Sequence, residues 1–519
     1  MASSPASNRL SQCETFKHTP GSVYLVSEAG VMLKLPIPSD SPQDPLTWSY
    51  SKRFLALSAL VLYASTAHFE INISGVITEP VDREFSKDSK HVDSEAISAA
   101  MTLGPALGYL LAVPLATAMG RKPVLVASAT ITCLSTLWAA ICGSFEQMLA
   151  AVGFQSIAAG ASISVSTLVL IDCTFIHERP LVIALHWSIL GVLSRVGMIG
   201  LPCLMSSETS WRHIYVVWLV VSTISLLLLV VLLPETFFLR PPVALDGRVL
   251  IQTASEKVLV YREEEFAGPR NEAETQSLTI NWKSLLATYM QMLLCLLNPM
   301  VLWVGLLTAT NLSGVVFLVS TQLDTLIEQK GQNPAIVSNL LGASGIIGAI
   351  LVFPLTGPVM TWFTRTQALR SGGVRHAEVY LFSFSIPIFT GFLSVLINGL
   401  TIHYSWPPFF IYFSTTLIIF SYLSANVAFT IWITEAFPKW AAPALAVQLM
   451  MGNIVSFGIA NGILACLNGR YILTATIILC VTNAVLGFLV VPAVFWGREV
   501  RQFIHGYWGR SERGALRPQ

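Results

Sequence analysis

A few ionisable or polar residues interrupt apolar stretches of the sequence, and these are the residues most able to carry chemistry. His68, Glu70 and Asn72 lie within one apolar stretch, and His186 and Arg195 lie within another. On insertion scales, an ionisable group inside a membrane helix costs roughly 2.5–3.5 kcal/mol, so it usually faces a cavity or a partner. We therefore expect these five residues to bind a solute or to carry protons.

The positions of these residues suggest one specific pairing. Helical geometry places His68 and Asn72 on one face and Glu70 nearly opposite. We expect Glu70 and Arg195 to lie at compatible depths and form a charge pair, which protonation of Glu70 or a substrate cation would open. A static structural ion pair explains the same residues equally well. His68, near a helix end, could simply reach toward the membrane surface.

The composition indicates which elements hold these residues. The chain has 519 residues, of which 54% are hydrophobic and only 11% charged, and its mean hydropathy is +0.65. A soluble protein would carry about a quarter of charged residues, so we expect a multi-spanning membrane protein. A net charge of +1 argues against a nucleic-acid partner. The 8 cysteines are not spaced as a disulfide framework or a zinc site.

The hydropathy pattern predicts about twelve membrane helices, each long enough to span a bilayer. A charged loop, 78–95, follows the first of them. We expect helices at 54–76, 96–119, 124–143, 148–171, 181–205, 214–233, 300–320, 336–360, 379–400, 409–433, 443–467 and 472–496.

The same pattern predicts five parts. They are a disordered cytoplasmic tail (1–53), a six-helix bundle (54–236), a cytoplasmic linker with an interfacial helix (237–298), a second six-helix bundle (299–497) and a basic cytoplasmic tail (498–519). An even number of spans puts both termini on one side. Because Lys and Arg gather on the cytoplasmic side, Arg121, Lys122 and Arg365 identify that side. Because the N-terminal segment is polar, we expect no cleavable signal peptide in it.

An internal repeat relates the two predicted bundles. Segment 114–121 aligns with 358–365, where Pro, Thr and Arg coincide. The same shift brings the first predicted helix onto the seventh.

Several short motifs are typical of one transporter family. They are the turn Gly120-Arg121-Lys122 with Gly108 before it, Asp44-Pro45-Leu46-Thr47-Trp48, Trp211-Arg212 and Pro234-Glu235-Thr236. In these motifs the chain resembles the major facilitator superfamily, and its fungal-type drug:proton antiporter branch in particular. The resemblance implies an all-α membrane protein whose two bundles of six helices bind a solute near the bilayer midplane. It also implies gating roles for Gly108, Gly120, Arg121, Lys122 and Arg365.

The resemblance further implies which helices meet. The second and fifth helices of each half would pack the halves together. They carry the small residues Gly104, Gly108, Gly191, Ser194, Gly197, Gly200, Gly342, Gly345, Gly348, Gly458 and Gly462. Helices 7 and 10 would line the cavity, so the implied substrate contacts are Asn311, Phe317, Tyr422, Asn426 and Phe429. Hydrogen bonds between helices explain any single Asn as well.

Three departures from the family pattern bear on proton coupling. Thr117 replaces the usual acidic residue of the signature turn, and Val152 replaces the arginine expected in the fourth helix. The glycine pattern of the fifth helix is degenerate around Arg195, which could supply the charge that position 152 lacks.

The sequence thus favours export of a small amphipathic organic compound by alternating access, coupled to protons. An uncoupled facilitator or an importer of the same fold remains the main alternative, and a non-transporting receptor is another. An enzyme is disfavoured, because the sequence has no phosphate loop, metal-ligand spacing or nucleophile elbow. We expect no cofactor, a monomer, and a lipid bilayer as its setting, with the plasma membrane favoured. Substrate and direction stay open.

Overall fold

The structure is a computed structural model. The residues described below are 22–24, 35–36, 38–39, 41–85, 94–204, 211–238, 243–245, 248–252, 258–262, 282–329, 331–371, 374–468 and 471–508.

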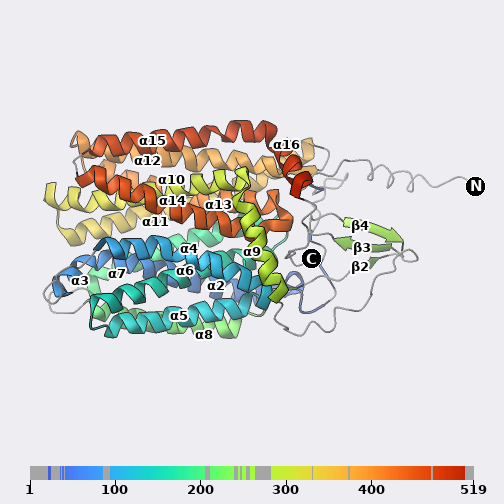
Figure 1. Ribbon diagram of the computed structural model, residues 1–519, viewed down its shortest axis with the longest axis horizontal. Coiled ribbons are helices and arrows are strands. Elements are labelled where there is room, and N and C mark those ends of the chain that lie inside the picture. Colours follow the sequence, from blue (N-terminus) through green and yellow to red (C-terminus); the bar gives the residue numbers. More distant parts are fainter. Residues whose placement is uncertain are drawn as a thin grey trace, which may run out of the picture.

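Twelve helices in this part of the chain are long and apolar enough to cross a membrane. The first half contains α2 (Tyr50–Val76), α4 (Ser94–Met119), α5 (Arg121–Ile141), α6 (Phe145–Asp172), α7 (Arg179–Leu204) and α8 (Arg212–Leu232). The second contains α10 (Pro299–Asp324), α11 (Pro334–Arg370), α12 (Ser385–His403), α13 (Phe409–Ala436), α14 (Ala441–Asn468) and α15 (Ile472–Phe488). Figure 1 shows the two groups lying side by side with nearly parallel helices. The predicted twelve-helix fold is confirmed.

Several helices differ from their predicted bounds. The predicted loop after α2 contains a short helix, α3 (Thr78–Phe85), because Val81 and Phe85 bury one face of it near Trp211. The predicted ninth helix begins as a 3-10 helix, η4 (Ala377–Phe384), and the predicted twelfth breaks into α15 and α16 (Val490–Trp508). A π-helical turn, η3 (Thr325–Gln329), extends α10.

A few short strands accompany the helices of this nearly all-helical fold. β1 (Ser22–Tyr24) pairs antiparallel with β5 (Val374–His376). The predicted linker holds a three-stranded antiparallel sheet of β2 (Val243–Leu245), β3 (Arg248–Gln252) and β4 (Val258–Arg262). These segments alternate or cluster β-branched and apolar residues, a pattern that favours strands.

The predicted disordered tail is also ordered near its end, which corrects that prediction. The buried Asp44 carboxylate accepts hydrogen bonds from the Leu46 and Ser39 backbone N–H groups, at 3.0 and 2.9 Å. It thereby caps the 3-10 turn η1 (Pro45–Thr47). Trp48, which follows that turn, is buried as well, so the chain is anchored before α2 begins.

Helix α9 (Trp282–Leu296) occupies the position of the predicted interfacial helix. It packs against both α4 and α14, and therefore touches both halves (Figure 1). Thr288 and Met292 are buried, whereas Leu286 and Met290 are exposed. The helix thus has one buried and one exposed face, as expected of a helix that lies along an interface.

The two halves meet mainly along α7 and α11, and along α4 and α14. Gly345 of α11 lies against Arg195 of α7, and Gly342 lies against Ile199. Other predicted contacts are wrong. Gly104 and Gly108 pack against α6 of their own half, and a Cβ at Gly458 or Gly462 would meet nothing within 4 Å in the described chain. Glycine spacing alone does not tell which neighbour a helix approaches.

Candidate transport site and gate

Arg121 is held at one end of the first half by three different kinds of contact. Its guanidinium lies 3.1 Å from the Asp172 carboxylate at the end of α6 and donates to the Ala116 carbonyl at 2.7 Å. It also lies over the Phe237 ring, 4.7 Å from the centroid. Asp172 therefore gives Arg121 an acidic partner, although Thr117 replaces the usual acidic residue of the turn. The Thr117 hydroxyl instead lies 2.9 Å from the Thr288 hydroxyl of α9.

Glu235, from the Pro-Glu-Thr motif, caps the start of α5. Its carboxylate accepts the backbone N–H groups of Arg121 and Lys122 at 2.9 and 3.1 Å. A carboxylate at a helix N-terminus satisfies unpaired N–H groups and the helix dipole. Gly120 makes the close approach possible, because its φ is +98° and a Cβ there would lie 2.6 Å from the Glu235 carboxylate. This explains why a glycine must precede the basic pair.

A second charge cluster joins the two halves. Arg179, which begins α7, and Arg375, in β5, each lie 2.6 Å from a different oxygen of Glu435 at the end of α13. All three side chains are at most 2% exposed, and Arg375 also donates to the Tyr380 hydroxyl at 2.6 Å. Because Arg179 comes from the first half and Glu435 from the second, the cluster holds the halves together.

These contacts show which helix ends lie close together. Arg121 and Asp172 put the start of α5 beside the end of α6, and α7 begins a few residues later. Arg179, Glu435 and Arg375 then bring the start of α7 to the end of α13 and to the strand after α11. We call this the gate end. The basic turn after Thr117 and its repeat after Thr361 both lie there, as two parallel repeats require.

Glu70 and Arg195 do not form the predicted charge pair. The Glu70 carboxylate, 1% exposed, accepts hydrogen bonds from the Thr136 hydroxyl and, at 3.5 Å, from the Gln155 amide. Its partners thus belong to α5 and α6, within the first half. Because Glu70 is nearly opposite His68 on α2, it points away from α7. Gln155 and the buried Val152 occupy the part of α6 where the family arginine was expected.

Arg195 instead lies near residues of both halves. His68 of α2 and Tyr422 of α13 are within its electrostatic reach. Asn72 and Asn426 make hydrogen bonds within their own helices. Their amides donate to the backbone carbonyls of His68 and Tyr422 at 2.7 and 2.8 Å. The structure thus brings together three predicted site residues: His68, Arg195 and Tyr422.

The remaining predicted contacts lie elsewhere. Asn311 donates to the Ser421 hydroxyl at 2.9 Å and faces α12 and α13, so it links helices inside the second half. Phe317 is fully buried, and Phe429 packs edge-on against Phe384 with ring centroids 4.7 Å apart. His186 is buried at 3% exposure beside Trp187. Arg365 is exposed on α11.

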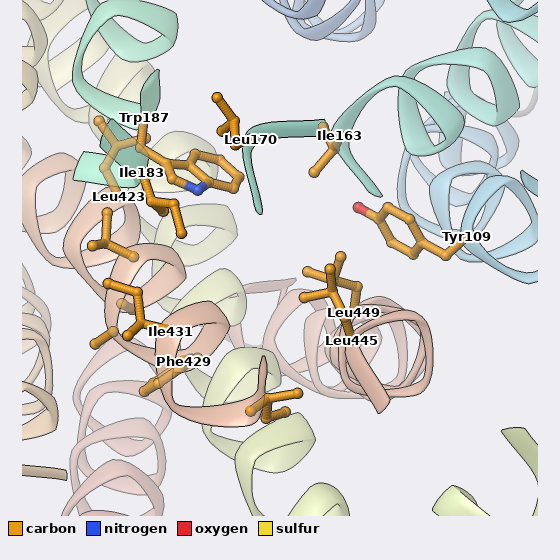
Figure 2. Close-up of a cluster of buried hydrophobic side chains, with 14 of the residues drawn as sticks. Tyr109, Ile163, Leu170, Ile183, Trp187, Leu423, Phe429, Ile431, Leu445 and Leu449 are labelled. Atoms are coloured by element: carbon orange, nitrogen blue, oxygen red, sulfur yellow. The ribbon is translucent and has the colours of Figure 1, made fainter. Parts of the chain in front are cut away.

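Apolar side chains dominate the boundary between the halves. Figure 2 shows side chains of the first half facing those of α13 and α14. The buried residues drawn there include Tyr109, Ile163, Leu170, Ile183, Trp187, Leu423, Leu445 and Leu449. The indole N–H of Trp187 has no hydrogen-bond partner among the described residues. A solute at this boundary would therefore meet mostly hydrocarbon and a few polar groups.

Sequence reasoning missed most of the gate residues. Asp172, Arg179 and Glu435 had a usable signal, because each is a charge next to the end of an apolar stretch. Arg375 had a weaker signal, since it lies in a loop between helices. Charge alone could not tell which of them pair, because the partners are far apart in sequence.

The arrangement defines a class: a multi-pass membrane protein of two helical bundles that meet at a central boundary. Residues 55–460 match the family model of the Major Facilitator Superfamily, and the chain belongs to this superfamily. It is therefore a membrane transporter rather than an enzyme.

Two comparisons agree with this assignment. The chain is 22% identical over 493 residues to an uncharacterized MFS-type transporter of Schizosaccharomyces pombe, covering 84% of this chain and 83% of that protein. Its fold is similar to that of the proton:xylose symporter XylE bound to 6-bromo-6-deoxy-D-glucose, with a TM-score of 0.60. That likeness has 12% identity and covers 86% of this chain and 96% of XylE, so it supports the fold alone.

Proposed function

We propose that the protein exports a small amphipathic organic compound by alternating access, in exchange for protons. The observation that carries the substrate class is the apolar boundary of Figure 2, where Trp187, Ile163 and Leu449 are all buried. Such a surface favours a solute with a large apolar body over a sugar, which needs many hydrogen-bonding partners. The resemblance to drug:proton antiporters supports the outward direction.

The gate end supports the alternating-access step. Arg179 and Glu435 join the halves there, and Arg121 is held inside the first half by Asp172 and Glu235. If the contact between Arg179 and Glu435 breaks while Arg121 keeps its contacts, the halves can separate without unfolding α5. We propose Gly108, Gly120, Lys122 and Arg365 as further parts of this gate.

We propose Glu70 as the proton-carrying group. It is a buried acidic side chain that no ion pair holds among the described residues, whereas Glu435 has two arginines. Hydrogen bonds from Thr136 and Gln155 can stabilise it in either protonation state after reorientation. The loss of the family arginine at Val152 then leaves the carboxylate free to exchange its proton.

We also propose the orientation and the setting. The gate end faces the cytoplasm because Arg121, Lys122 and Arg375 gather there. Both termini then lie in the cytoplasm, and the protein works as a monomer in the plasma membrane. The functional parts are the segments 54–236 and 299–497, joined by 237–298.

Transport into proteoliposomes tests the proposal. The probes are 2-naphthoate, 2-naphthamide and 2-naphthylmethylamine, which share an apolar ring and differ in charge. We expect at least one of them to accumulate when a proton gradient is imposed and to equilibrate only slowly without it. Equal rates with and without the gradient would indicate an uncoupled facilitator. Movement together with protons, in the same direction, would indicate an importer.

A further inference from the structure

Arg195 is a cation without a counterion among the residues that the structure describes. Its side chain is half-buried in α7, and it makes no hydrogen bond or ion pair with any residue that the structure describes. By contrast, the buried arginines Arg121, Arg179 and Arg375 each lie within 3.1 Å of a carboxylate. Charged residues inside membrane proteins are expensive and usually paired. An arginine that has no counterion among the described residues is therefore a candidate for binding the transported solute.

A glycine on the neighbouring helix α11 leaves space for the Arg195 side chain. Gly345 of α11 lies under it: a Cβ there would be 3.1 Å from the Arg195 Cδ and 3.4 Å from its Nε. His68 and Tyr422 are its polar neighbours, and the buried Nδ1 of His68 has no hydrogen-bond partner in the part of the chain that the structure describes. These groups come from α2, α7, α11 and α13, so both halves contribute.

The acidic groups of the described spans cannot serve as this partner. Glu70 is bonded to Thr136 and Gln155 on the other side of α2. Asp172 and Glu435 are held in ion pairs at the gate end. Among the described residues, the His68 imidazole and the Tyr422 phenol act electrostatically with Arg195, and both of them, like the guanidinium itself, can donate hydrogen bonds. This set attracts an anion and repels a cation.

We propose that the transported compound is an organic anion, whose carboxylate or similar acidic group binds Arg195 while its apolar part lies along the boundary of Figure 2. A planar guanidinium binds a carboxylate through two parallel hydrogen bonds. The nearby Tyr422 hydroxyl and His68 ring can supply further donors. This inference rests on the proposed transport function and narrows its substrate class. It also replaces the substrate cation considered from the sequence.

The three naphthalene probes test the inference on the purified full-length protein. Thermal unfolding and tryptophan fluorescence are recorded over a concentration series of each. We expect 2-naphthoate to bind at least ten times more tightly than 2-naphthamide, and 2-naphthylmethylamine to bind most weakly. If the amide or the amine binds as tightly as the acid, the inference is wrong.

Variants then locate the binding site. Arg195→Gln should lose the preference for the acid, and Arg195→Lys should retain part of it because the charge stays. Gly345→Ala should weaken binding of the acid, because the added methyl group would displace the aliphatic part of the Arg195 side chain. Arg370→Gln removes an exposed arginine at the end of α11 and should leave binding unchanged. Should Arg195→Gln fold but keep the preference, Arg195 is not the site. If Arg195→Gln does not fold, Arg195→Lys and Gly345→Ala test the site instead. If neither variant weakens the binding of 2-naphthoate, Arg195 is not the site.

The same probes separate this inference from the proposed function. If the protein binds 2-naphthoate selectively but moves none of the probes across proteoliposomes, the transport proposal fails and the anion site stands. If it transports the amine or the amide and ignores the acid, transport stands and the anion site fails.

Discussion

At the scale of single residues, the partner of each buried charge decides its role. Glu70 and Arg195 lie on adjacent helices, yet Glu70 bonds to Thr136 and Gln155, whereas Arg195 lies near His68 and Tyr422. One group is suited to exchange a proton and the other to hold an anion. The separation lets the two tasks be tested one at a time.

Glu70→Gln should remove the dependence of transport on pH, because the amide has the size of the carboxyl group but cannot ionise. Uptake by proteoliposomes, measured from pH 5.5 to 8, checks this. Glu499→Gln changes an exposed carboxylate of α16 and should keep the wild-type profile. An unchanged pH profile in Glu70→Gln would remove Glu70 as the proton carrier.

Glu435→Gln should destabilise the protein by about 3–5 kcal/mol, because it leaves two buried guanidinium groups without a counter-charge. Arg179→Gln should cost less, since Glu435 keeps Arg375. Thermal unfolding of the purified variants gives the order of the two effects. The reverse order would mean that Arg179, rather than Glu435, is the centre of the cluster.

At the scale of helices, close packing depends on where glycines meet a neighbour. Gly108 lies against α6, and a Cβ there would meet the Ile157 carbonyl and lie 2.9 Å from the Ala161 nitrogen. Gly458 of α14 is followed by Gly462 at the same spacing that separates Gly104 from Gly108. A Cβ at Gly458, however, would meet no described atom within 4 Å. The two positions look alike in sequence and differ in packing.

Gly108→Ala should therefore destabilise the first half by about 1–3 kcal/mol through overpacking against backbone that cannot move aside. Gly458→Ala is the matched control and should change stability little. Thermal unfolding and the yield of folded protein are the measurements. Equal effects of the two substitutions would contradict the close contact between α4 and α6.

At the scale of the whole molecule, the alternating access that we propose requires the halves to move apart at the gate end. The α7–α11 boundary reaches that end, where a Cβ on Gly357 would lie 3.2 Å from the Ala184 Cβ. Disulfide-bonded cysteines have Cβ atoms about 3.5–4.5 Å apart. A small shift of the backbone at these two positions would let cysteines introduced there form a disulfide bond.

The double variant Ala184→Cys, Gly357→Cys should form a disulfide across the boundary and stop transport, and a reductant should restore it. Each single variant is a control, since it cannot form that bond. Full transport activity in the cross-linked protein would show that the halves do not separate at this place, and would contradict the rocking mechanism.

The sequence by itself determined the number of spans, the internal repeat and the gate-end glycine and basic turn, because hydrophobic length and basic turns are local properties. It also singled out His68, Arg195 and Tyr422 as candidate site residues, which the structure brings near one another. Only the tertiary structure decided that Asp172 gives Arg121 an acidic partner, that Glu435 joins the halves, and that Glu70 faces away from Arg195. These pairings join residues far apart in the chain, so they depend on how the helices rotate and pack rather than on local spacing.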